Sequence, residues 1–77
     1  MNKVRRQKLA DLCAGIEWLV AKVDELYDEE VVFRDGMPEN LQGSARYEAA
    51  ADACSCLEYA SAYLSDAMDQ VIAAMGN

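Results

Sequence analysis

The chain has 77 residues, a net charge of −7 and no histidine. A chain of this length forms one domain with a modest core, and the lack of histidine removes the commonest general base and the commonest metal ligand. Three cysteines, an odd number, argue against a closed disulfide framework and favour a reducing, cytoplasmic compartment.

Membrane and enzyme classes are also disfavoured by the sequence. No stretch approaches the roughly 20 apolar residues that span a bilayer, and no long apolar run follows the basic start as in a signal peptide. The serines have no histidine to activate them, and the acidic residues lack the spacing of a calcium loop. We therefore expect no membrane association, no enzyme activity, no cofactor and no metal site.

The first helix is predicted over residues 3–33. Its apolar residues recur in alternating steps of three and four, which is a heptad seam. They are Leu9, Leu12, Ile16, Leu19, Val23 and Leu26. Gly15 inside this helix costs about 1 kcal/mol relative to alanine. It either permits the close approach of another helix or is simply tolerated.

The connection is predicted over residues 34–44. Asp35-Gly36 is typical of a turn or helix end. Pro38 pushes Met37 toward an extended backbone, and Ser44 has the side chain of a helix N-cap.

The second helix is predicted over residues 45–75. Its seam alternates alanine with larger apolar residues: Ala53, Leu57, Ala60, Leu64, Ala67, Val71 and Ala74. Alanine at these positions lets helices approach closely. Other sides of this helix are apolar too, which is more than one partner helix needs. The chain is thus predicted to be a single all-α domain, residues 1–77, folded as a coiled-coil-like antiparallel hairpin that dimerises into a four-helix bundle.

The first helix carries its charges in the unfavourable direction for a helix dipole. Its first turns are basic, with Lys3, Arg5, Arg6 and Lys8. Its last turns are acidic, with Asp24, Glu25, Asp28, Glu29 and Glu30. Something beyond this helix must offset the resulting repulsion.

An antiparallel pairing of two first helices is one way to offset these charges. Centred between Glu17 and Trp18, it pairs apolar residues as Leu9 with Leu26, Leu12 with Val23, and Ile16 with Leu19. The same register places Arg5 opposite Glu30 and Arg6 opposite Glu29 of the partner. Such self-complementarity is the form of a two-fold contact. The alternative lies within one hairpin, where Asp66 and Asp69 balance the basic start, and Arg46 with the positive end of the second helix balances the acidic end.

Three sets of residues are candidates for binding. The acidic cluster, Asp24, Glu25, Asp28, Glu29 and Glu30, has the chemistry to dock a basic host protein or to mimic a run of phosphates; its simpler interpretation is a solvated surface. The aromatic set, Trp18, Tyr27, Tyr59 and Tyr63, is interpreted as packing in the core or a dimer interface, with a binding face as the alternative. The cysteines, Cys13, Cys54 and Cys56, are interpreted as small buried hydrophobic residues.

Two stretches of the chain, Met1-Asn2-Lys3-Val4-Arg5-Arg6-Gln7-Lys8-Leu9 and Met37-Pro38-Glu39-Asn40-Leu41-Gln42-Gly43-Ser44, resemble a family of short acidic proteins. Phages, prophages and integrative elements of Gram-positive bacteria carry this family. The chain departs from the family's pattern at Gly36, where Asn or Asp is usual, and in a second helix that is rich in Ala and Cys rather than Glu. The resemblance implies a setting, the bacterial host cell, and no particular mechanism.

By analogy with other small acidic phage proteins, the leading hypothesis is a protein-binding inhibitor of a host defence or nucleic-acid enzyme, similar to anti-CRISPR or DNA-mimic proteins. One alternative is a structural or assembly homo-oligomer. The other is a small regulator that contacts DNA through Arg5 and Arg6, although the overall acidity argues against nucleic-acid binding.

Overall fold

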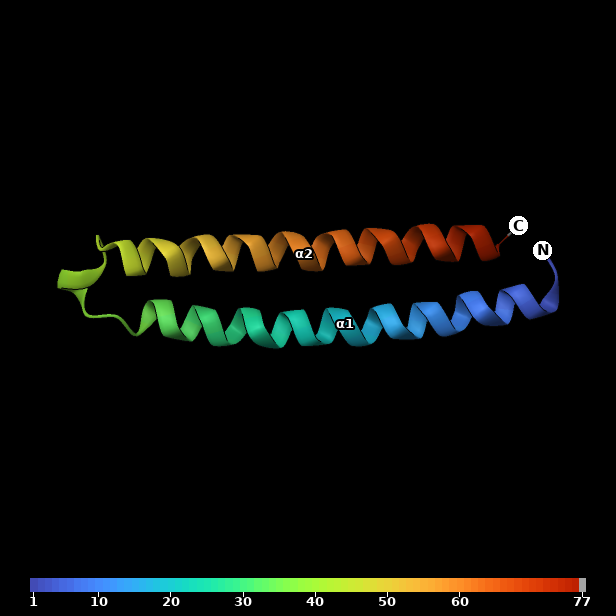
Figure 1. The fold of residues 1–77 in the computed structure, drawn as a ribbon, viewed down its shortest axis with the longest axis horizontal. Helices are drawn as coiled ribbons and strands as arrows, with labels where there is room; N and C mark the ends of the chain where they lie inside the picture. The colour runs from blue at the N-terminus through green and yellow to red at the C-terminus, as the bar shows by residue number, and fades with distance from the viewer. Residues whose placement is uncertain (77) are drawn as a thin grey trace.

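The computed structural model describes residues 1–76 as two long helices joined by one short connection. The elements are α1 (Lys3–Asp35), a 3₁₀ turn η1 (Glu39–Leu41) and α2 (Ala45–Met75). The helices run antiparallel side by side, with both chain ends at one end of the molecule and the connection at the other (Figure 1). The predicted all-α hairpin is therefore confirmed. Helix α1 continues to Asp35, beyond the predicted end at residue 33, and α2 has the predicted bounds.

Both helices begin at a polar side chain that caps exposed backbone N–H groups. The Arg5 N–H donates to Oδ1 of Asn2 at 2.7 Å, and the Tyr47 N–H donates to Oγ of Ser44 at 3.2 Å. Each bond satisfies one donor that has no partner within its helix. Ser44 is thus the N-cap of α2 that the sequence predicts.

The two helices meet along a regular seam, here given heptad letters a and d. On α1 the seam consists of Leu9, Cys13, Ile16, Val20, Val23, Tyr27, Glu30 and Arg34. On α2 it consists of Tyr47, Ala50, Cys54, Leu57, Ser61, Leu64, Met68, Val71 and Met75. Every one of these side chains is buried or half-buried, and their steps alternate between three and four residues, as helix–helix packing of this class requires.

This seam corrects the predicted one on both helices. On α1, Leu9, Ile16 and Val23 are in the seam, but Leu12, Leu19 and Leu26 are 45–53% exposed. On α2, the alanines of the predicted seam flank it instead of occupying it. Both helices are rotated by about 50° from the predicted orientation, which is half the angle between successive helical residues. The hairpin gains by this rotation, because Met68 and Met75 bury more apolar area than Ala67 and Ala74.

The hydrophobic core of the single hairpin is thin. Among the described residues only Ile16, Ala50 and Cys54 are buried apolar residues, and Ile16 keeps 9% of its surface exposed. The molecule measures 60 × 14 × 12 Å and has a radius of gyration of 17.5 Å, whereas a compact domain of this length has about 11 Å. A shape this elongated leaves much apolar surface in contact with solvent.

Within residues 1–76, no ion pair joins the two helices to neutralise the reversed charges of α1. None of Lys3, Arg5, Arg6 and Lys8 forms an ion pair with Asp66 or Asp69. At the other end, Arg46 lies over the ring of Phe33, 5.2 Å from its centre, and forms no ion pair with the acidic cluster. The ion pairs found within residues 1–76 join near neighbours on α1, Lys22 with Glu25 and Arg34 with Asp35.

Candidate functional site

The hairpin has two different sides on either side of its seam. Heptad e positions of both helices flank the seam on one side, and g positions flank it on the other. Two observations establish this: Asp24 and Glu58, both at e, line one cleft, and Phe33 and Arg46, both at g, are in contact. The chemistry of each side follows from the residues at these positions.

An acidic cleft lies on the e side, between the middles of α1 and α2. Its lining residues are Asp24, Tyr27, Glu58, Ser61 and Ala62, and its volume is about 290 Å³. The hydroxyl of Ser61 donates to Oδ1 of Asp24 at 2.8 Å, which ties this carboxylate to the opposite helix. Two carboxylates next to a tyrosine ring favour the binding of a lysine or arginine side chain.

The residues of the predicted acidic cluster do not form one flat patch. Asp24 lies in the cleft, and Glu25 pairs with Lys22 at 3.4 Å. Asp28 and Glu29 are exposed, whereas Glu30 is a half-buried seam residue. The cluster therefore wraps around the last turns of α1. Sequence reasoning missed Glu58 as a companion of Asp24, since only the pairing of the two helices brings these carboxylates together.

An apolar surface lies on the g side, and we call it the leucine face. From α1 it contains Leu12, Leu19, Leu26 and Phe33, and from α2 it contains Ala53, Ala60, Ala67 and Ala74. The four α1 side chains are 43–53% exposed. The predicted self-association residues are thus divided: Leu9, Ile16 and Val23 pack against α2, while Leu12, Leu19 and Leu26 lie on the leucine face. Arg5 and Arg6 are exposed at the start of α1.

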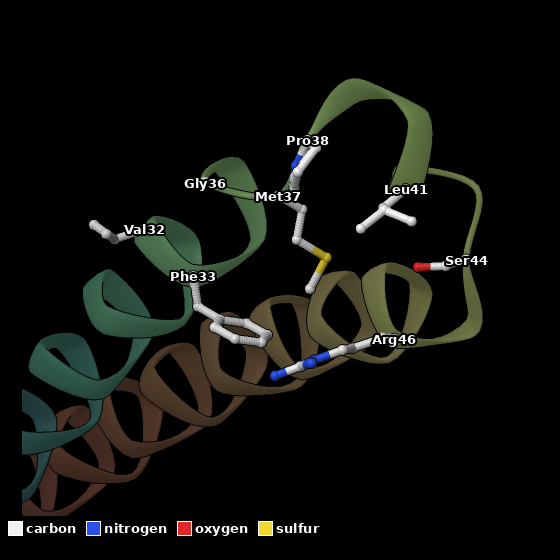
Figure 2. Close-up of a pocket in the computed structure, with 8 residues that line it drawn as sticks. All are labelled: Val32, Phe33, Gly36, Met37, Pro38, Leu41, Ser44 and Arg46. Atoms are coloured by element: carbon white, nitrogen blue, oxygen red, sulfur yellow. The ribbon is translucent and has the colours of Figure 1, made fainter.

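A second cavity, of about 400 Å³, lies at the connection end of the hairpin. Its lining residues are Val32, Phe33, Gly36, Met37, Pro38, Leu41, Ser44 and Arg46. Figure 2 shows the side chains of Met37 and Leu41 directed from the connection toward the start of α2, with the Arg46 guanidinium beside the Phe33 ring. The walls are mostly apolar, so this cavity extends the leucine face around the end of the hairpin. The hydrogen bond to Asp35 raises the pKa of the nearby Arg34 guanidinium.

The aromatic residues are mostly on the outside of the hairpin. Trp18, Tyr59 and Tyr63 are 61–68% exposed, so they are not part of the hairpin core. The rings of Tyr59 and Tyr63 stack with 6.4 Å between their centres, and Nζ of Lys22 lies 5.5 Å from the ring centre of Trp18. Tyr27 is half-buried in the seam and lines the acidic cleft.

The cysteines differ in environment. Cys54 is buried and Cys13 is half-buried in the seam, as predicted, but Cys56 is exposed. The prediction of three buried cysteines is therefore wrong for Cys56, because residues two apart on a helix point in nearly opposite directions.

Within residues 1–76, no group of three or more His, Cys, Asp or Glu side chains is arranged to hold a metal ion. No helix in the same range has the length and apolar character needed to cross a bilayer.

Comparison with known protein families, curated proteins and solved structures finds no match to this chain. The candidate sites consequently rest on the geometry and chemistry of the hairpin itself.

Proposed function

We propose that the chain is a non-enzymatic protein-binding module of a phage or mobile element, and that it acts as a homodimer in the cytoplasm of the bacterial host. Its binding surface for a host protein is the acidic cleft, and the partner is basic. The best specific role is inhibition of a host defence or nucleic-acid enzyme.

The acidic cleft is the observation that supports this function most directly. Asp24 is held by Ser61 from the opposite helix, so one carboxylate is already oriented before a partner arrives. Glu58 lines the same cleft and supplies a second negative charge. A basic surface that normally contacts phosphates meets two carboxylates in this cleft, of which Asp24 is held in place. The net charge of −7 favours the approach of such a surface over longer distances.

The leucine face supports a second candidate function, that of a structural or assembly homo-oligomer without a host partner. The leucines in this row are about half exposed, and an exposed row of apolar side chains is typical of an interaction surface. Self-association would remove this surface from water. The two candidates differ in what they require of the acidic cleft. Only the inhibitor needs its negative charge.

Neutralising the cleft tests the proposed function. The immobilised wild-type chain captures proteins from a Gram-positive bacterial lysate, and each captured protein is purified and its affinity is measured. For the true partner, the double variant Asp24→Asn/Glu58→Gln binds at least tenfold more weakly, because both carboxylates lose their charge while the Ser61 hydrogen bond keeps an acceptor.

The matched control is Asp66→Asn/Asp69→Asn, which removes the same charge from exposed positions of α2 outside the cleft. It retains most of the wild-type affinity, with a smaller loss from the change in net charge. Equal weakening by the two double variants would exclude the cleft as the binding site. A chain that captures no specific protein would favour the assembly function.

A further inference from the structure

The leucine face has a composition that the rest of the helix surface lacks. Beyond Arg46 at the connection end, the g side of α2 holds only alanine, at Ala53, Ala60, Ala67 and Ala74. The acidic residues of α2 all lie at other heptad positions: Glu48, Asp52, Glu58, Asp66 and Asp69. Two such faces can therefore approach each other without placing like charges of α2 in contact.

We propose that a second copy of the chain covers the leucine face, with α1 packed antiparallel on α1 of the partner and the two-fold axis passing beside Leu19. This inference rests on the proposed homodimer and specifies its surface and register. In this register Leu12 lies opposite Leu26 of the partner subunit, and Leu19 lies opposite itself. Each large exposed side chain in the middle of the face thereby meets another.

Charge complementarity selects the same register. Heptad c positions form the outer rim of the leucine face on α1, and they hold Lys8, Gly15, Lys22 and Glu29. When Leu12 is opposite Leu26, the partner's Glu29 is the rim residue nearest to Lys8, offset from it by one residue or about 1.5 Å along the helix axis, and two-fold symmetry repeats this pair at the other end of the interface. Neither Lys8 nor Glu29 has an ion-pair partner within residues 1–76.

Gly15 also agrees with this pairing. It lies within one residue of the level of Lys22 of the partner, and a Cβ placed at Gly15 would meet no atom within 4 Å beyond its chain neighbours and the adjacent backbone of its own helix. The room at Gly15 therefore serves no packing within one hairpin and is available to the partner.

The register differs from the one expected from the sequence. That register used Leu9, Ile16 and Val23 as interface residues, and these pack against α2 of their own chain. In the proposed register, g positions of α1 face g positions of the partner's α1. The pair Lys8–Glu29 then takes the place of the pairs Arg5–Glu30 and Arg6–Glu29. This pair still brings the basic start of one α1 close to the acidic end of the other.

A second copy is favoured over other occupants by this self-complementarity. A membrane surface or an unrelated amphipathic helix has no reason to match the spacing of both the leucines and the rim charges. The thin core of the single hairpin adds to the argument, because small domains of this length commonly gain the missing burial by association.

A charge swap tests the register. The variants are Lys8→Glu, Glu29→Lys and the two combined, and the measurement is the dimer dissociation constant by sedimentation equilibrium, with helicity followed by circular dichroism. Each single variant creates two like-charged pairs and raises the dissociation constant about tenfold. The combined variant restores oppositely charged pairs and returns the constant to within about threefold of wild type.

The controls are Lys3→Glu and Asp28→Lys, which make the same charge changes at exposed positions away from the leucine face. Both dimerise within about threefold of wild type. A wild-type chain that is monomeric overturns the proposed homodimer together with this inference. A wild-type dimer that does not respond to the single swaps, or is not rescued by the combined swap, overturns only this surface and register.

Discussion

Individual residues in this hairpin play roles set by which way their side chains point rather than by residue type. Cys54 and Cys56 illustrate this, since the first is 3% exposed and is one of the few buried apolar residues, while the second is exposed. The sequence identifies both as small and apolar. Only the seam decides which of them is covered.

Replacing these cysteines one at a time is expected to separate them. Cys54→Ser places a hydroxyl in the buried seam and lowers the free energy of unfolding by about 1–3 kcal/mol. Cys56→Ser changes it by less than about 0.5 kcal/mol, as is usual for a surface substitution. Urea denaturation followed by circular dichroism measures both, and similar losses for the two variants would contradict the assigned seam.

At the scale of the helices, the sequence predicts which segments are helical far better than which side each helix buries. The Pro/Gly-containing connection and the Ser44 cap locate the start of α2, because these signals are local. The seam is not local. Leu9, Ile16 and Val23 can belong to either of two apolar stripes. One stripe adds Leu12, Leu19 and Leu26, and the other adds Cys13, Val20 and Tyr27. Which stripe is buried depends on the side chains that α2 packs against it.

The same limit explains what was missed in the candidate site. The acidic turns of α1 are visible in the sequence as a run of carboxylates. The pairing of Asp24 with Glu58 and Ser61 is not, because it depends on the register between two helices that are far apart in sequence. The sequence predicts one stripe of apolar residues on α1 for self-association, but half of them, Leu9, Ile16 and Val23, belong to the hairpin core.

The cap of α2 gives a prediction at this scale. Ser44→Ala removes the acceptor for the Tyr47 N–H and lowers the free energy of unfolding by about 1 kcal/mol. Ser55→Ala, at an exposed position inside α2, is the control and is neutral or slightly stabilising because alanine favours helix. Thermal unfolding at a fixed protein concentration compares the two. Equal stability of Ser44→Ala and wild type would show that the cap does not contribute.

At the scale of the whole molecule, the hairpin separates two kinds of surface. The acidic cleft lies on the e side of the seam and the leucine face on the g side. A dimer joined through the leucine faces therefore leaves both clefts directed outward. Such a particle presents two equivalent sites to a basic partner, and a partner with repeated basic surfaces gains avidity from engaging both.

The central claim is that two copies of the chain dimerise through their leucine faces. It is tested most directly by measuring the mass of the wild-type chain and of a variant with one charge placed on the two-fold axis. In sedimentation equilibrium, the wild-type chain has twice the 8.5 kDa mass of a single hairpin. Leu19→Asp places two carboxylates against each other on the axis and weakens the dimer at least hundredfold. Trp18→Asp, at the neighbouring exposed residue about 100° around α1 from Leu19, leaves the dimer intact. A monomeric wild-type chain, or a dimer that tolerates Leu19→Asp as well as Trp18→Asp, would contradict the account.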